Sequence, residues 1–129
     1  MTDTAVWPDA EQVVMDLIED LGDVTIRPDT DLADRLPLIW VRKLPGSTDN
    51  GITEVSRVQV DTYAATIDEA RGIAAEIQRR FADGRLLETG HGMADRTFTD
   101  TSPHEEPAAD AENTRLVSAV YRVDCRPNF

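Results

Sequence analysis

Apolar residues recur at helical spacing near the start of the chain. Between Pro8 and Gly22 they fall on one stripe, formed by Val13, Val14, Leu17, Ile18 and Leu21. Proline is tolerated in the first turn of a helix, where its missing N–H is not needed, and glycine often follows the last turn. The pattern predicts an amphipathic helix over residues 8–21 with one face toward a core.

A second helical pattern begins with a capping box. Thr66 is placed to accept a hydrogen bond from the backbone of Glu69, whose side chain can return to the cap. The apolar stripe that follows consists of Ile67, Ala70, Ile73, Ala74, Ile77 and Phe81. Gly84 comes after two arginines that suit the C-terminal end of the helix dipole. The sequence therefore predicts a helix over residues 67–82, and its small alanines would let it lie close to a sheet.

Other segments alternate between apolar and polar residues or are rich in β-formers, as strands are. The predicted strands are residues 24–27, 36–44, 55–63, 86–89, 93–99 and 114–126. Strands 36–44 and 55–63 flank a run of turn-forming residues, which indicates a hairpin with a long polar tip at 44–53. Residues 100–113 are polar and contain two prolines, so we expect an acidic loop there.

These elements predict a single α+β domain over residues 1–129. Two amphipathic helices against one mostly antiparallel sheet of four to five strands is the economical two-layer arrangement. Trp40 lies between Ile39 and Val41 in one predicted strand, so an apolar side chain must face away from the helices. Either the chain's own loops or a neighbouring subunit would cover that side of the sheet.

The charge of the chain is strongly negative and unevenly distributed. The net charge is -12, and residues 1–34 hold ten acidic residues and one basic residue, a net of -9. Asp100 to Glu112 contains five carboxylates and no lysine or arginine. Such a balance argues against wrapping nucleic acid or docking on an anionic membrane. No apolar run approaches the ~20 residues that span a bilayer, so we expect no membrane contact.

Residues suited to catalysis or metal binding are few. The two histidines, His91 and His104, have no plausible nucleophile beside them in sequence. The single cysteine, Cys125, falls on the apolar side of the last predicted strand, where we expect a buried thiol. The sequence thus predicts no catalytic residue, cofactor or metal site, and it favours a protein that is not an enzyme. A small hydrolase or isomerase with carboxylate chemistry around His91 is the alternative.

The order of features resembles that of small tail terminator (tail completion) proteins of long-tailed bacteriophages of the non-contractile type. The segments that carry the resemblance are VWPDAEQVVMDLIEDLG, PLIWVRKLPGSTDNG, VSRVQVDTYAATIDEARGIAAEIQRRF and VSAVYRVDCRP. The most familiar unit is residues 60–66, VDTYAAT, which leads into Ala70 and Ala74. The resemblance covers most of residues 6–126. Other head–tail joining proteins share this size and layout.

The resemblance implies an α+β fold and a hexameric ring in the virion, at the tail or neck, assembled in the cytoplasm of the bacterial host. Such a ring caps the tail tube, ends its polymerisation and joins the tail to the head connector. Its partners are further copies of itself, the tail tube protein and a head connector or stopper protein. DNA passes through the ring without specific binding, and a lumen rich in carboxylates would suit that passage.

The residues expected to contact the tail tube or a neighbouring ring lie in the hairpin arm. They are Arg42, Lys43, Asp49 and Asn50, and an ordinary solvated turn is the alternative reading of each. Two other functions stay open at this point. One is another head–tail joining protein of the head-completion or neck type, and the other is a small cytosolic α+β protein that binds a partner as a dimer.

Overall fold

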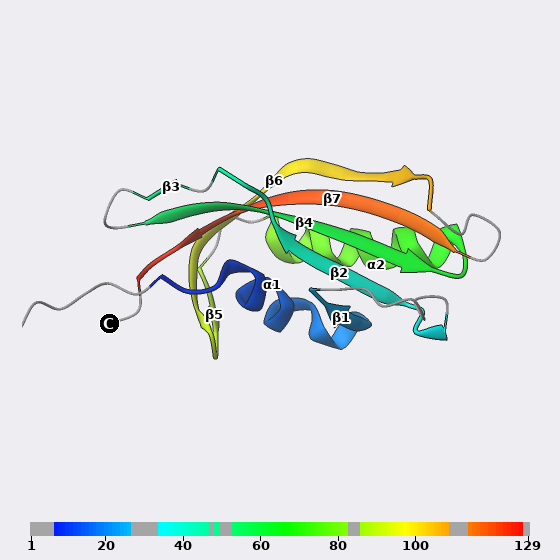
Figure 1. Ribbon diagram of the computed structural model, residues 1–129, viewed down its shortest axis with the longest axis horizontal. Helices are drawn as coiled ribbons and strands as arrows, with labels where there is room; N and C mark the ends of the chain where they lie inside the picture. The colour runs from blue at the N-terminus through cyan, green and yellow to red at the C-terminus, as the bar shows by residue number, and fades with distance from the viewer. Residues whose placement is uncertain are drawn as a thin grey trace, which may run out of the picture.

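A computed structural model describes residues 7–26, 34–46, 48–49, 53–82, 86–108 and 114–127. In these ranges the chain forms one seven-stranded sheet and two α-helices (Figure 1). The elements are α1 (Ala10–Ile18), the 3₁₀ turn η1 (Glu19–Leu21), β1 (Asp23–Thr25), β2 (Leu38–Lys43), β3 (Thr48–Asp49), β4 (Glu54–Ala64), α2 (Ile67–Phe81), β5 (Leu87–Thr89), β6 (Gly92–Glu106) and β7 (Arg115–Cys125). The α+β class is confirmed, and the sheet has more strands than the four to five expected.

The strands are ordered β1-β2-β4-β7-β6-β5, and β3 also pairs with β4. Only β1 and β2 run parallel, and the other described pairs are antiparallel. The predicted hairpin is confirmed, because Leu38 pairs with Tyr63 and Lys43 with Val58. The sheet is larger than expected because the short strands β1, β3 and β5 also pair with the long ones. The strand β3 lies inside the predicted tip at 44–53.

Both helices pack on one face of the sheet. Figure 1 shows the strands β2, β4 and β7 along the molecule's long axis, with α2 behind β2 and β4 and α1 below them. Alternate residues of a strand point to opposite faces, and the apolar set faces the helices. The main core comprises Ala10, Val13, Val14, Ile18, Ile39, Val41, Val58, Val60, Ile77, Phe81, Ala94, Ala119, Tyr121, Val123 and Cys125. This face is therefore the interior of a two-layer domain.

Local hydrogen bonds fix the ends of both helices. Asp9 caps α1 and accepts from the backbone N–H of Glu11 at 2.9 Å, so the helix begins two residues after Pro8. The end of α1 tightens into η1, and at Gly22 a Cβ atom would lie 3.0 Å from the carbonyl oxygen of Pro37. Thr66 caps α2 and accepts from the N–H of Glu69 at 3.2 Å, as predicted.

The expectation of an acidic loop at residues 100–113 is wrong for its first half. Strand β6 continues to Glu106, which pairs with Leu116 of β7, while residues 109–113 lie outside the described ranges. The register shifts between Thr99 and Thr101 and again before His104. Each bulge inserts an extra residue and breaks the two-residue alternation by which a strand is recognised. Pro103 lies within the second of these shifts, and proline in a strand is confined to such bulges and to edges.

Arg80 joins the two helices on their outer surface. Its guanidinium donates to the carbonyl oxygen of Leu17 at 2.7 Å, to the Asp20 carboxylate at 2.6 and 2.8 Å, and to Glu76 at 3.1 Å. The hydrogen bond from Arg80 holds the pKa of Asp20 at about 2, below its ordinary 3.8. Bonds from Arg79 and Arg80 likewise hold the pKa of Glu76 at about 2, below its ordinary 4.5.

Because of this cluster, we expect the stability of the fold to decrease at acidic pH. A carboxyl group whose pKa is depressed by folding stabilises the fold above its unfolded pKa, and the contribution is lost as the pH falls toward the folded value. We expect the urea midpoint to fall between pH 4.5 and pH 2, and Arg80→Met to lessen that fall. Arg71→Met, which removes an exposed pair with Glu105, should leave the pH dependence as it is. If the urea midpoints of Arg80→Met and the unaltered chain fell equally with pH, the pH dependence would not come from the contacts of Arg80.

Candidate partner-binding surface

No helix of the described chain packs on the second face of the sheet, called here the open face. Strand alternation places mostly polar and aromatic side chains of four strands on it. They include Trp40 and Arg42 of β2, Arg57, Gln59, Asp61 and Tyr63 of β4, Ser118, Arg122 and Asp124 of β7, and Arg96, Phe98 and His104 of β6. In this two-layer domain the open face is the broad surface available to a partner.

A buried aspartate organises the centre of the open face. Asp61 is 3% exposed and accepts from the Ser118 hydroxyl at 2.5 Å and from the Gln59 amide at 3.0 Å. The Arg42 guanidinium lies 3.7 Å from its second oxygen. A buried carboxylate is tolerated when it is hydrogen-bonded and paired in this way. Sequence reasoning missed this site, although Gln59 and Asp61 stood on the polar side of the predicted strand 55–63.

Arg42 and Trp40 form a stacked pair beside this aspartate. The guanidinium carbon of Arg42 lies 4.2 Å from the centre of the Trp40 ring, and the indole N–H donates to the carbonyl oxygen of Ile26 at 3.0 Å. The Nε of Arg42 is buried and has no hydrogen-bond partner in the described chain. Stacking holds Arg42 against the sheet, while 40% of its side chain stays exposed.

Further arginines on the open face are paired with carboxylates. Arg57 donates to Asp100 at 2.8 and 3.0 Å, and Arg122 donates to both oxygens of Asp124 at 2.8 and 2.9 Å. The Arg122 guanidinium also lies over the Phe98 ring at 5.2 Å. The bond to Asp124 raises the pKa of Arg122. The face therefore carries charges of both signs, and three of its arginines lie beside carboxylates of the same chain.

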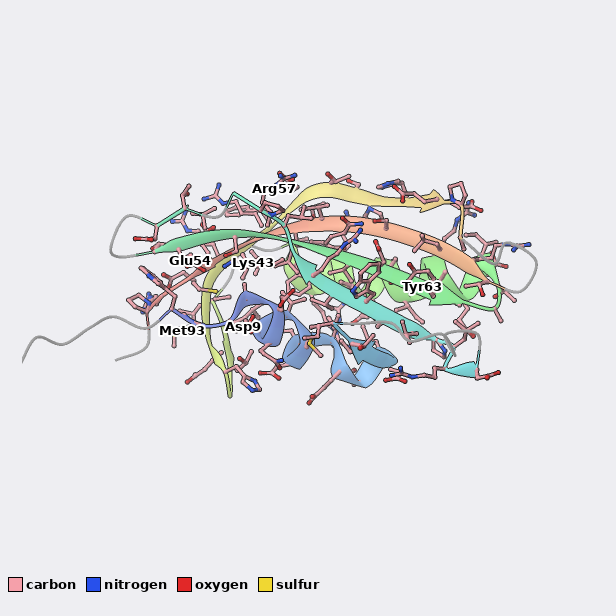
Figure 2. The ribbon with its side chains drawn as sticks, in the orientation of Figure 1. Asp9, Lys43, Glu54, Arg57, Tyr63 and Met93 are labelled. Atoms are coloured by element: carbon pink, nitrogen blue, oxygen red, sulfur yellow. The ribbon has the colours of Figure 1, made fainter. Side chains whose placement is uncertain are left out.

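The structure places three of the four residues expected to contact partners. Arg42 lies on the open face, whereas Lys43 points to the helix side, where its Nζ is 3.2 Å from Glu54 Oε1 (Figure 2). The backbone N–H of Lys43 donates to Glu11 of α1 at 2.8 Å. Asp49 lies in the exposed strand β3, and Asn50 is outside the described residues. Arg42 and Lys43 therefore lie on opposite faces of the sheet, and the role of all four residues as partner contacts stays a prediction.

The two histidines contact nearby carboxylates, and the cysteine lies in the core. His91 lies 2.6 Å from Asp16 and joins the β5–β6 turn to α1. His104 lies 2.8 Å from Glu106 and 3.0 Å from the carbonyl oxygen of Ser102, and these contacts raise its pKa. Cys125 is a free, fully buried thiol whose pKa is raised to about 12 by burial, which confirms the expected core position.

The described residues contain no group of three or more histidine, cysteine, aspartate or glutamate side chains placed to hold a metal ion. None of the described helices is both long and apolar enough to cross a membrane.

Comparison with known proteins finds a likeness of fold. No protein-family model matches the chain, and no curated protein matches its sequence. A chain in the solved structure "Virion of native gene transfer agent (GTA) particle" has a similar fold, with a TM-score of 0.55. The likeness covers 91% of this chain and 87% of that chain, at 16% sequence identity. At this identity the likeness shows that the two chains share a fold.

Proposed function

We propose that this chain is a structural protein of a phage-like virion, and that it acts as a tail terminator. In this role a ring of copies caps the finished tail tube, ends its polymerisation and joins the tail to the head connector. The observation that carries the proposal is the fold shared with a gene transfer agent virion chain over 91% of this chain. The sequence resemblance to tail terminators points in the same direction independently of that structure.

The open face supports a role in assembly rather than catalysis. In its buried polar centre, Asp61 is hydrogen-bonded to Ser118 and Gln59 of the same chain. Its peripheral arginines Arg57 and Arg122 are neutralised by Asp100 and Asp124. Cations neutralised in this way contribute little to phosphate binding, which suits a particle whose DNA must pass without being held.

The hairpin arm is the proposed contact with the tube or a neighbouring ring. Arg42 is held by Trp40 on the open face, and Asp49 is exposed at the far end of the molecule in β3 (Figure 1). Lys43 contributes by fixing the base of the arm, because it ties Glu54 and Glu11 to the end of β2. The arm is thus held by hydrogen bonds where it leaves the sheet, and its far end in β3 is exposed and accessible to a partner.

Deletion of the gene from the bacterium or phage that encodes the chain tests the proposal. We expect tail tubes of irregular and excessive length and heads without tails, both seen by electron microscopy, with normal particles restored by the gene supplied in trans. Tails of normal length left unattached to heads would assign the chain to another step of head–tail joining. Normal particles that lack the chain by mass spectrometry would overturn a virion role.

A further inference from the structure

The outer side of strand β6 offers unpaired backbone. In the described chain β5 pairs with β6 only over Gly92–Ala94, although β6 continues to Glu106. In antiparallel pairing, successive residues of a strand turn their N–H and C=O groups alternately to its two sides. Because β7 takes one side of β6, the groups on the other side beyond Ala94 meet no strand of the described chain. Such an edge can pair with an extended segment of another chain.

The two halves of this side of β6 differ in how well they are protected from pairing. After Thr99 the register to β7 shifts twice, and the strand holds Pro103 and the carboxylates of Glu105 and Glu106. Bulges, proline and charge are devices that keep edge strands from pairing. The stretch Arg96–Thr99, in contrast, has no proline and no shift within it, and its threonines and phenylalanine favour strands. These four residues are called here the β6 edge.

Arg96 places an unpaired positive charge on the β6 edge. Its side chain is exposed, and no described carboxylate lies within ion-pair distance of it. Three other arginines of the open face lie beside carboxylates of the same chain. A guanidinium forms its strongest hydrogen bonds with a carboxylate or a phosphate. A partner that brings one carboxylate to this position is therefore complementary to the β6 edge in charge.

Phe98 adds an exposed apolar group to the same edge. It lies two residues from Arg96, so both side chains stand on the open face, and 37% of Phe98 is exposed. On the β7 side the Arg122 guanidinium lies 5.2 Å from the centre of its ring, which leaves the outer side to a partner. Aromatic and aliphatic side chains directly opposite each other on neighbouring strands stabilise the pair. An apolar residue two positions from the carboxylate of an added strand would therefore meet Phe98.

We propose that the β6 edge binds an extended segment of another protein, which joins the sheet as a strand. The segment carries an aspartate or glutamate opposite Arg96 and an apolar residue two positions away, opposite Phe98. Backbone hydrogen bonds give affinity, and the two side chains give selectivity. Nucleic acid fits less well, because it cannot pair with the backbone of the edge as a strand does and would approach a chain of net charge -12. The inference goes beyond the proposed function and does not depend on it.

Synthetic peptides test the site in the purified chain by NMR titration. The probe is acetyl-Thr-Val-Thr-Glu-Thr-Val-Thr-amide, whose valines flank the glutamate at two positions on either side and so suit both strand directions. One control peptide has glutamine in place of glutamate, and we expect it to bind at least about tenfold more weakly. The other, acetyl-Thr-Thr-Val-Glu-Val-Thr-Thr-amide, has the same composition with its valines on the opposite face, and should bind about threefold more weakly. Arg96→Gln should abolish the preference for glutamate over glutamine, whereas Arg71→Gln, at an exposed arginine of α2, should keep it.

The same titration locates the bound peptide. The backbone amide signals of Arg96–Thr99 should shift, and those of Ser102–Glu106 should stay in place. A probe that does not bind, that shifts other amides, or that binds no better than its two controls would overturn the proposal. So would a single-stranded DNA oligonucleotide that binds the same edge more tightly, or self-association of the chain that Phe98→Glu abolishes, since the occupant would then be nucleic acid or a second copy. None of these outcomes alters the gene-deletion phenotype, so the two proposals fall separately.

Discussion

Replacing Phe81 by alanine is expected to lower the free energy of unfolding by about 3–5 kcal/mol, the range for emptying a large buried aromatic site. Phe81 is fully buried at the end of α2, and its ring centre lies 4.9 Å from that of Tyr121 in β7. Its carbonyl oxygen also accepts from the Thr97 hydroxyl of β6 at 2.9 Å. One position therefore joins the last turn of α2 to two strands of the sheet, and its loss leaves a cavity where they meet.

Urea unfolding of purified Phe81→Ala gives the measurement, and Phe98→Ala is its matched control. Phe98 has the same side chain on β6 but is 37% exposed on the open face. Its truncation should therefore cost about 1 kcal/mol or less, because a side chain that is partly in water buries less area. Equal losses in the two variants would show that the helix-side core is not where the two layers are held together.

The helices were predictable because their signals are local. The cap at Thr66 and the stripe that ends at Phe81 lie within one helix and need no knowledge of the rest of the chain. The strand order was not predictable in this way. A period of two tells which residues share a face but not which strand lies beside which, and the β4–β7 pair joins segments far apart in sequence.

The candidate surface was predictable only in part, for the same reason. Neighbouring residues of a strand point to opposite faces. The side chains of Arg42 and Lys43 therefore lie on opposite faces of the sheet because residues 38–43 form a strand. The Asp61–Ser118 bond, in contrast, depends on the register of β4 against β7, which places these two residues opposite each other. The polar half of β6 escaped prediction because its bulges break the alternation that identifies strands.

The open face and the helix-side core make different demands on the sequence. The core tolerates apolar residues of suitable size. On the open face, arginines pair with particular aspartates of the same chain. Arg57 with Asp100 joins β4 to β6 across the intervening β7, and Arg42 with Asp61 joins β2 to β4. Charged side chains that are paired within the chain are held in place and bind other molecules less readily. Such a surface suits a protein that must contact only specific partners during assembly.

Replacing Asp61 by alanine is expected to cost about 2–3 kcal/mol of unfolding free energy, the penalty for leaving hydrogen-bonding groups buried without a charged acceptor. Ser118 and Gln59 would both lose the carboxylate that they contact at 2.5 and 3.0 Å, and Arg42 would lose its counter-ion. Asp61→Asn keeps an oxygen acceptor of the same shape and should cost about half as much. The difference between the two variants separates the hydrogen bonds of the network from its charge.

Asp100→Ala is the control for this network, and urea unfolding is again the measurement. It removes the ion pair with Arg57, whose side chains are 50% and 37% exposed, and should cost less than about 1 kcal/mol because water screens it. If Asp61→Ala were as mild as Asp100→Ala, the carboxylate would be solvated in the native state rather than enclosed by the sheet. The contrast between the two aspartates therefore decides whether the centre of the open face is a rigid, internally bonded platform for a partner.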